Sequence, residues 1–160
     1  MKAKMTDFKQ VYNKYSEDVF RFSLWLCANY DEAKDITSET FIRMWTARTE
    51  TKTETVKAYL FTIARNLYLK SVKADKRKTV LDESIIEPSD LATNIESKSD
   101  LERTLTALQI LPELERSAIA MRSFNGMSYQ EISKALNISL ALVKVKIHRG
   151  RIKLLKNLED

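Results

Sequence analysis

The sequence predicts an all-α protein made of two small helical domains joined by a flexible acidic linker. Only two glycines and two prolines occur in 160 residues, so the turn signals that separate strands are scarce. Apolar residues, 44% of the chain, recur every three or four positions, as they do in amphipathic helices. Residues 79–98 depart from this pattern, because they hold Pro88 and carry five acids against one lysine. We therefore place the domains at residues 1–78 and 99–160.

The first domain should contain three helical stretches. Apolar residues recur at helical spacing from about Thr6 to Asn29, and a second helix begins at Asp31, where acidic residues suit the positive end of the helix dipole. A third helix runs from about Val56 to Lys78. The polar loop before it, Thr46 to Thr55, has a length typical of loops that are functional or mobile.

The second half of the third helix is basic, with Lys70, Lys73, Lys76 and Arg77 against the single acid Asp75. A basic half-helix beside a loop that carries several threonines suits the phosphate backbone of a nucleic acid. The alternative is an ordinary solvated helix end, where the helix dipole favours cations.

The second domain should begin with two helices, one from Ser99 to Ile110 and one that starts at Pro112, a residue that the first helical turn tolerates. Asn125 and Gly126 form a turn signal. Ser128, followed three residues later by Glu131, is a capping-box pattern, so a short helix should begin there.

A second turn follows this short helix. Asn137 tolerates the left-handed backbone conformation that such a turn needs, and Ser139 can cap the next helix. In that last helix Val143, Ile147 and either Leu154 or Leu155 recur at helical spacing and should face inward.

The last helix is also strongly basic, because no acid occurs between Ser139 and Glu159 while lysines and arginines are frequent. A capped support helix, a tight turn and a basic second helix together predict a helix-turn-helix, whose second helix enters the major groove of DNA. The alternatives are a solvated surface or a docking face for an acidic protein.

Several kinds of site are not predicted. Cys27 is the only cysteine, so no internal disulfide or cysteine-based zinc site is expected. The only histidine, His148, is flanked by cations, and no glycine-rich phosphate loop occurs. We therefore expect no enzyme activity, no metal, no cofactor and no small-molecule substrate. The chain shows no signal peptide or membrane-spanning run, which predicts a soluble cytoplasmic protein without direct membrane insertion.

Four stretches, in order, resemble the extracytoplasmic-function sigma factors of bacterial RNA polymerase. They are DEAKDITSETFIRMW, AYLFTIARNLYLKSVKADKR, LPELERSAIAMRSFNGMSYQEISKALNIS and SLALVKVKIHRGRIKLL. They are similar to that family's polymerase-docking helix, promoter-melting helix, start of the second domain and recognition helix. The resemblance covers the chain from about Phe8 to Leu158.

The resemblance implies a sigma factor that binds the clamp and flap surfaces of core polymerase and directs promoter-specific initiation. It also implies an anti-sigma factor as a partner, and an acidic linker that passes through the RNA path of the polymerase. The polymerase-binding residues would be Asp35, Glu39, Phe41, Arg43 and Trp45. The loop would capture a base flipped from the −10 element. Residues for the −10 element would be Thr49, Thr51, Thr53, Arg65, Asn66, Lys70, Lys73, Lys76 and Arg77. Residues for the −35 element would be Arg122, Lys144, Val145, His148, Arg149 and Arg151, and Lys153 would contact the DNA backbone.

The sequence departs from the family pattern at several positions. Ser38 replaces a usual glutamine, and Lys70 replaces a usual aspartate and adds a charge that attracts phosphate. In the last helix, Leu142 replaces a usual threonine, and Val145 replaces a usual serine. Val145 cannot hydrogen-bond a base edge but can meet a thymine methyl group. Gly150 replaces a usual alanine, at a cost to the helix of up to about 1 kcal/mol.

Two other functions fit parts of this pattern. An autonomous helix-turn-helix regulator would bind an operator without polymerase, usually as a dimer, although no additional dimerisation helix is evident. An interaction module would use its basic helices to bind an acidic protein and would show no DNA sequence preference.

Overall fold

The computed structural model describes residues 5–47, 56–78 and 95–159. These residues form helices joined by short turns, and no strand occurs among them, which confirms the all-α prediction. The elements are α1 (Met5–Cys27), α2 (Tyr30–Ala47), α3 (Val56–Lys78), α4 (Ile95–Ile110), α5 (Glu113–Ile119), the π-helical turn η2 (Ala120–Phe124), α6 (Tyr129–Leu136) and α7 (Leu140–Glu159). We call α1–α3 the N-terminal module and α4–α7 the C-terminal module.

In the N-terminal module, α1, α2 and α3 pack against one another around large apolar side chains. Val19, Phe22 and Leu26 of α1 are fully buried, and the Phe22 ring stacks on Phe61 of α3 with centroids 4.5 Å apart. The second helix begins at Tyr30 rather than at the predicted Asp31. The side chain of Asn29 explains this start, because its Oδ1 accepts a hydrogen bond from the Glu32 amide at 2.9 Å.

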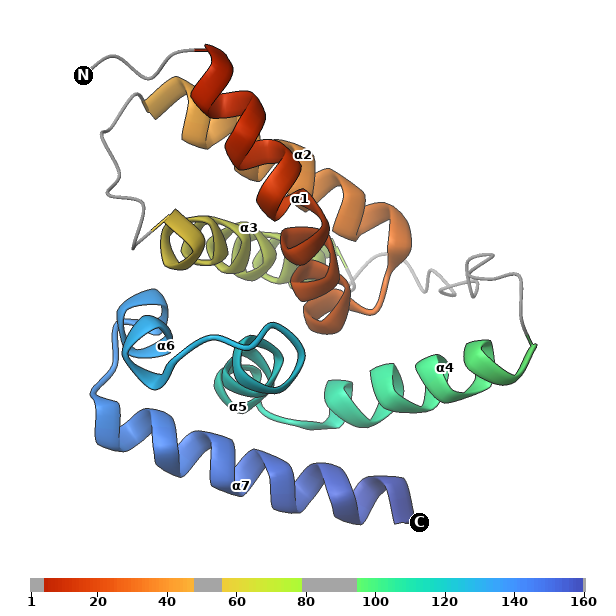
Figure 1. The fold of residues 1–160 in the computed structure, drawn as a ribbon. Helices are drawn as coiled ribbons and strands as arrows, with labels where there is room; N and C mark the ends of the chain where they lie inside the picture. Colours follow the sequence, from red (N-terminus) through yellow and green to blue (C-terminus); the bar gives the residue numbers. More distant parts are fainter. Residues whose placement is uncertain (1–4, 48–55, 79–94, 160) are drawn as a thin grey trace.

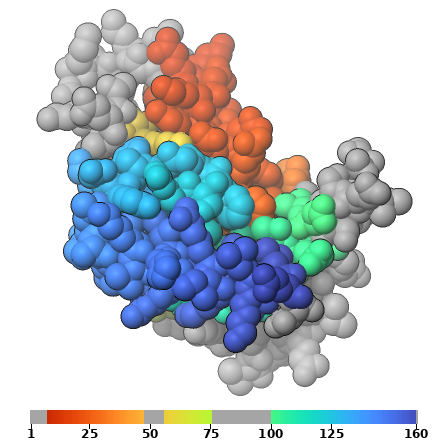
Figure 2. Space-filling view, turned by 60° about the horizontal axis from the view of Figure 1, so that its bottom comes forward, coloured from red at the N-terminus to blue at the C-terminus, as the bar shows by residue number. Residues whose placement is uncertain are grey.

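In the C-terminal module, α5 and α6 lie between α3 and α7, and α7 forms an outer face of the molecule (Figures 1 and 2). Helix α4 begins at Ile95, four residues before the predicted start and inside the segment assigned to the linker. The remainder of that segment, residues 79–94, lies outside the described residues.

The structure confirms that the first residues predicted to face inward on α7 do so. Val143 and Ile147 are buried, and Gly150 continues the same face. Leu154 packs against the buried cluster that contains Ile119, whereas Leu155 is 61% exposed. Of the two leucines that the periodicity allowed, Leu154 therefore faces the core.

The two modules contact each other through apolar side chains. One continuous cluster of buried residues includes Phe22 and Phe61 of the N-terminal module together with Met121 and Ile132 of the C-terminal module. At its edge, the ring of Trp25 stacks on Phe124 with centroids 4.3 Å apart and an interplanar angle of 20°. The structure thus holds the two modules together by a shared core.

Candidate nucleic-acid interface

The support helix of the helix-turn-helix, α6, begins at the predicted capping box. The Ser128 hydroxyl accepts a hydrogen bond from the Glu131 amide at 3.1 Å, and the Glu131 carboxylate accepts one from the Ser128 amide at 3.0 Å. These bonds satisfy amide groups that a helix start otherwise leaves unpaired. The residue types at this start therefore fix where the helix begins.

The turn after α6 also has the predicted geometry. Asn137 lies in the left-handed region with φ of 54°. The Ser133 hydroxyl donates to the Ile138 carbonyl at 2.6 Å, which ties the turn to α6. The Ser139 hydroxyl accepts a hydrogen bond from the Leu142 amide at 3.1 Å and caps the next helix. The orientation of α7 is thus set by local hydrogen bonds.

The buried stripe of α7 turns the predicted −35 residues away from the core. A helix has about 3.6 residues per turn, so residues out of phase with Val143 and Ile147 must face outward. The side chains exposed in this way are Lys144, Val145, His148, Arg149 and Arg151. Together they make one continuous, largely basic surface along the helix.

Three cations of this region have partners within the protein. Arg122 is partly buried, donates from Nη1 to the Met127 carbonyl at 2.9 Å, and lies 4.6 Å from the centre of the Tyr129 ring. Lys144 approaches the same ring, with Nζ 5.9 Å from its centre. Lys153 pairs with the buried carboxylate of Glu115 at 3.0 Å. Lys153 therefore has an ion-pair partner within the protein. Its contact with the DNA backbone stays a prediction.

Only some of the residues predicted to bind the −10 element lie in the described part of the structure. Asn66, Lys70 and Lys73 are partly or fully accessible on α3 and lie on the half of the helix that we expected to be basic. Lys76 and Arg77 belong to the last turn of α3, but their side chains are outside the described part of the structure. The loop residues Thr49, Thr51 and Thr53 also lie outside the described residues.

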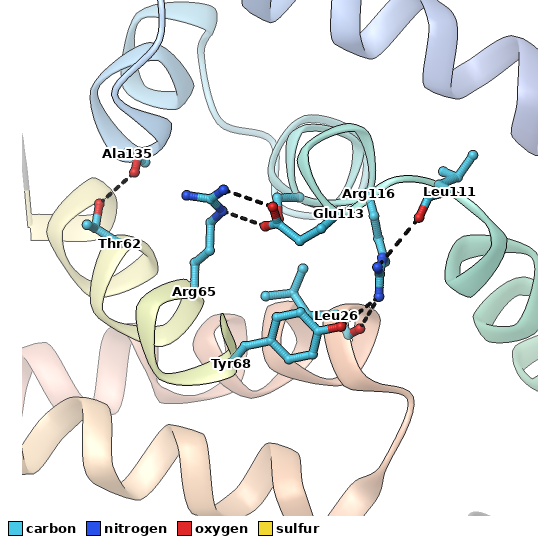
Figure 3. Close-up of polar contacts among 9 residues, drawn as sticks. Leu26, Thr62, Arg65, Tyr68, Leu111, Glu113, Arg116 and Ala135 are labelled. Carbon is cyan, nitrogen blue, oxygen red and sulfur yellow. Dashed lines mark hydrogen bonds and ion pairs between the residues drawn. The ribbon is translucent and has the colours of Figure 1, made fainter. Parts of the chain in front are cut away.

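Arg65, a predicted −10 residue, points toward the C-terminal module (Figure 3). Its guanidinium binds the Glu113 carboxylate through two hydrogen bonds, Nε to Oε1 at 2.6 Å and Nη2 to Oε2 at 2.9 Å. Ser117 donates a further hydrogen bond to the same carboxylate at 2.7 Å. Burial raises the pKa of Glu113, but the bonds from Arg65 and Ser117 outweigh burial and hold the pKa below its usual value.

A second arginine, Arg116, joins the two modules at a buried position (Figure 3). Its Nη1 donates to the Leu26 carbonyl at 2.8 Å and lies 2.9 Å from both the Tyr68 hydroxyl and the Gln109 side-chain oxygen. Leu26 is in the last turn of α1, where carbonyls lack helical partners and a cation is favoured. Nearby, Thr62 of α3 donates to the Ala135 carbonyl at 3.0 Å.

The predicted polymerase-binding residues lie on two different sides of α2. Asp35 and Arg43 are exposed, and Glu39 pairs with Arg43 at 3.2 Å. Phe41 is 2% exposed and packs on Tyr12 with centroids 5.0 Å apart. Trp45 is 42% exposed at the end of the helix. Phe41 and Trp45 thus lie on the aromatic side of α2 that meets α1, and the charged row lies on another side.

Sequence reasoning missed Ile42, Glu113 and Arg116. Ile42 lies on the polar side of α2 and is 54% exposed, so an apolar residue in an otherwise charged row was an available signal. Glu113 and Arg116 carried no such signal, because their partners lie 48 and 90 residues away along the chain. Within the described residues there is no group of metal-ligating side chains, and no helix with an apolar run long enough to cross a bilayer.

Comparison with known proteins connects the two modules to one family. The model of sigma-70 region 2 matches residues 11–78, and the model of sigma-70, region 4 matches residues 101–154. The chain belongs to the sigma-70 family. Both regions occur in order, and each falls on one module. This supports a sigma factor, which directs promoter-specific initiation by core polymerase, over an autonomous regulator.

Relatives place this sigma factor in the extracytoplasmic-function group. It is 29% identical to the ECF RNA polymerase sigma factor SigE of Mycolicibacterium smegmatis, over 93% of this chain, and it spans 60% of the length of that protein. It is 28% identical to the ECF RNA polymerase sigma factor SigM of Bacillus subtilis, with 91% of each chain covered.

Solved structures show the same fold. The sigma factor RpoE from Bartonella quintana, in complex with the anti-sigma factor NepR, has a TM-score of 0.79 and 23% identity, covering 97% of this chain and 98% of its own. CnrH, in complex with the cytosolic domain of CnrY, has a TM-score of 0.77 and 20% identity, covering 98% of this chain and 90% of its own. The fold likeness therefore extends over both modules.

Proposed function

We propose that the two modules of this sigma factor have separate binding roles. The face of α2 with Asp35 and Glu39 binds core polymerase. The basic half of α3 and the segment between α2 and α3, residues 48–55, act on the −10 element, and α7 contacts the −35 element. The observation that carries this proposal is the helix-turn-helix whose buried stripe leaves a basic face outward, next to a module that matches sigma-70 region 2.

The chain supplies binding groups and no catalytic group in this scheme, and the polymerase performs the chemistry. We place the protein in the bacterial cytoplasm, where its polymerase and promoters are found. The boundaries 1–78, 79–98 and 99–160 remain our proposed division into two domains and a linker. The two family matches, to residues 11–78 and 101–154, support it, and α4 begins at Ile95, within the segment assigned to the linker.

An anti-sigma factor is the partner that we propose for the inactive state. RpoE, which shares this fold, was solved with the anti-sigma factor NepR bound, and CnrH was solved with the cytosolic domain of CnrY bound. In the arrangement seen here, Arg65 binds Glu113 and therefore cannot bind a DNA phosphate at the same time. A partner that holds the two modules together would keep Arg65 from DNA, and separation of the modules would release it.

Co-elution with bacterial core RNA polymerase tests the docking assignment. The double variant Asp35→Lys/Glu39→Lys should bind core polymerase about tenfold more weakly, because two acids of the docking face become cations. Glu17→Lys, a reversal at an exposed position on α1, is the matched control and should leave binding unchanged. Equal binding by all three proteins would exclude this face of α2 as the docking surface.

Promoter-directed transcription tests the assignment of α7. Arg149→Ala should lower promoter-specific transcription while leaving binding to core polymerase intact, because Arg149 is exposed on the DNA face of α7. If the variant loses polymerase binding instead, the role assigned to α7 is wrong.

A further inference from the structure

The part of α7 that faces directly away from the core is apolar near the start of the helix. Because a helix turns by about 100° per residue, Val145 lies almost opposite the buried residues Val143, Ile147 and Gly150. Its side chain is 39% exposed. Ala141, one turn earlier, lies on the same outward face and is also exposed. The outermost side chains of the first two turns are therefore Ala141 and Val145.

The neighbouring cations do not cover this apolar position. Lys144 precedes Val145, but its ammonium group lies toward the Tyr129 ring of α6, at 5.9 Å from the centre. Arg122 sits over the same ring at 4.6 Å and is bound to the Met127 carbonyl. Both cations thus lie to the side where α6 packs, and Val145 itself is accessible on the outward side of the helix.

The chemistry of a major groove decides what such a side chain can contact. Valine and alanine offer only methyl groups, and the apolar group that base pairs present in the major groove is the thymine C5-methyl. Recognition helices place their N-terminal residues against base edges, which is where Ala141 and Val145 lie. Arg149 follows Val145 by one turn, is exposed on the same face, and has the geometry to bind guanine through two hydrogen bonds.

We propose that Val145, supported by Ala141, is the specificity-determining residue that selects a thymine methyl group in the −35 element, and that Arg149 selects a nearby guanine. The helix rises by about 1.5 Å per residue, so Val145 and Arg149 are about 6 Å apart along its axis. That separation corresponds to roughly two steps of about 3.4 Å along one DNA strand. The two selected bases should therefore lie within about two steps of each other.

This inference rests on the proposed function of α7, so its test begins with the complete holoenzyme. Full-length protein is combined with core polymerase and used to select binders from a random duplex pool. A −35 motif with thymine near guanine is the expected result. In the selected duplex, each −35 thymine is then replaced by uracil, which removes only the methyl group. Loss of one contacted methyl should weaken binding about fourfold.

Two variants locate the effect on the helix. Val145→Ser should bind the thymine and uracil duplexes equally. Ile152→Ser is the matched control, since Ile152 is 54% exposed on the same face but lies two turns further from the start of α7. It should keep the fourfold preference for thymine. Circular dichroism checks that both variants retain the native helix content.

The possible failures can be distinguished. If the native holoenzyme selects a −35 motif but binds thymine and uracil duplexes equally, the methyl assignment is wrong and the proposed function stands. If Val145→Ser keeps the preference for thymine, Val145 is not the selecting residue. If the protein does not bind core polymerase, or the holoenzyme selects no upstream motif, the proposed function itself is overturned.

Discussion

Arg65 of α3 and Glu113 of α5 form a two-bonded ion pair that joins the two modules. The distances are 2.6 and 2.9 Å, and the arginine and glutamate side chains are only 16% and 24% exposed. A paired geometry of this kind is stronger than a single surface contact, because both hydrogen bonds are charge-assisted. The ion pair therefore links a residue expected to assist DNA binding to the opposite module.

Replacement of Glu113 by glutamine should weaken the contact between the modules. Glutamine keeps the size of the side chain but removes the charge that Arg65 faces across a partly buried site. We expect the free energy of unfolding to fall by about 1–3 kcal/mol, measured by urea denaturation. The control is Glu39→Gln, which removes a carboxylate paired with Arg43 at an exposed position. That change should cost less than about 0.5 kcal/mol, and equal losses in the two variants would contradict the importance of the buried pair.

The same pair should make stability depend on pH. The pKa of Glu113 is lowered in the folded protein, so its ion pair contributes fully above the unfolded pKa of about 4.3 and is lost as pH falls through the lower folded value. The native protein should therefore be more stable than Glu113→Gln at neutral pH. The difference should shrink to zero as the carboxylate becomes protonated. Urea midpoints for both proteins between neutral and acidic pH measure this, and a constant difference would refute it.

Arg116 should contribute more to the free energy of unfolding than either residue of an exposed ion pair such as Glu39–Arg43. Methionine in its place would remove the donor shared by the Tyr68 hydroxyl and the Gln109 side-chain oxygen. The Leu26 carbonyl would lose its bond to Arg116 but keep the one from Gln109 Nε2 at 3.1 Å. We expect Arg116→Met to lower the free energy of unfolding by about 3 kcal/mol or more, since each unpaired buried group costs about 1–3 kcal/mol. Tyr68→Phe, which removes one of these bonds, should cost about 1 kcal/mol.

Trp25 gives a direct readout of the same contact. Its ring stacks on Phe124 of the opposite module, so separation of the modules exposes it to water. In a Trp45→Phe background, Trp25 is the only tryptophan of the chain. Its emission should shift to longer wavelength in Arg116→Met and remain unchanged in Tyr68→Phe. An unshifted spectrum in Arg116→Met would show that Arg116 does not hold the modules together.

The features that the sequence predicted well are local. The capping box at Ser128, the left-handed Asn137 and the cap at Ser139 each depend on residues within about five positions, and all three are confirmed. Periodicity placed Val143 and Ile147 correctly, because a helix has a fixed repeat. The start of α4 was wrong by four residues, because the helix begins at Ile95, inside the acidic segment that composition assigned to the linker.

The features that the sequence did not predict depend on partners far away in the chain. Nothing near Arg65 indicates that its guanidinium binds Glu113, and nothing near Arg116 indicates burial. Tyr12 is one of the residues at helical spacing between Thr6 and Asn29, yet it is 44% exposed because it lies at the edge of an aromatic cluster with Phe41. Local pattern thus predicted the helices and the exposed basic side of α7, whereas the contacts between modules depend on the tertiary structure.

Gly150 is the clearest case in which tertiary packing changes the meaning of a residue. The sequence suggested only a cost to the helix. In the structure, a Cβ at this position would overlap the Ile119 Cδ1 atom and lie 3.1 Å from its Cγ1, so the buried Ile119 side chain would have to shift. Gly150→Ala gains about 1 kcal/mol of helix preference but overpacks the contact by about 1–3 kcal/mol. We therefore expect a net loss of stability.

Shortening the Ile119 side chain should relieve the loss of stability caused by Gly150→Ala. Ile119→Val removes the Cδ1 atom that the new methyl group would meet. In the native background it should destabilise the protein by about 0.5–1.5 kcal/mol, because it leaves a small cavity. In the Gly150→Ala background the same change should stabilise the protein, because it relieves the clash and lets the alanine methyl fill the space. Thermal unfolding of the four proteins in this double-mutant cycle measures the sign of each step. If Ile119→Val is destabilising by the same amount in both backgrounds, close approach of the two helices is not the reason that glycine occupies this position.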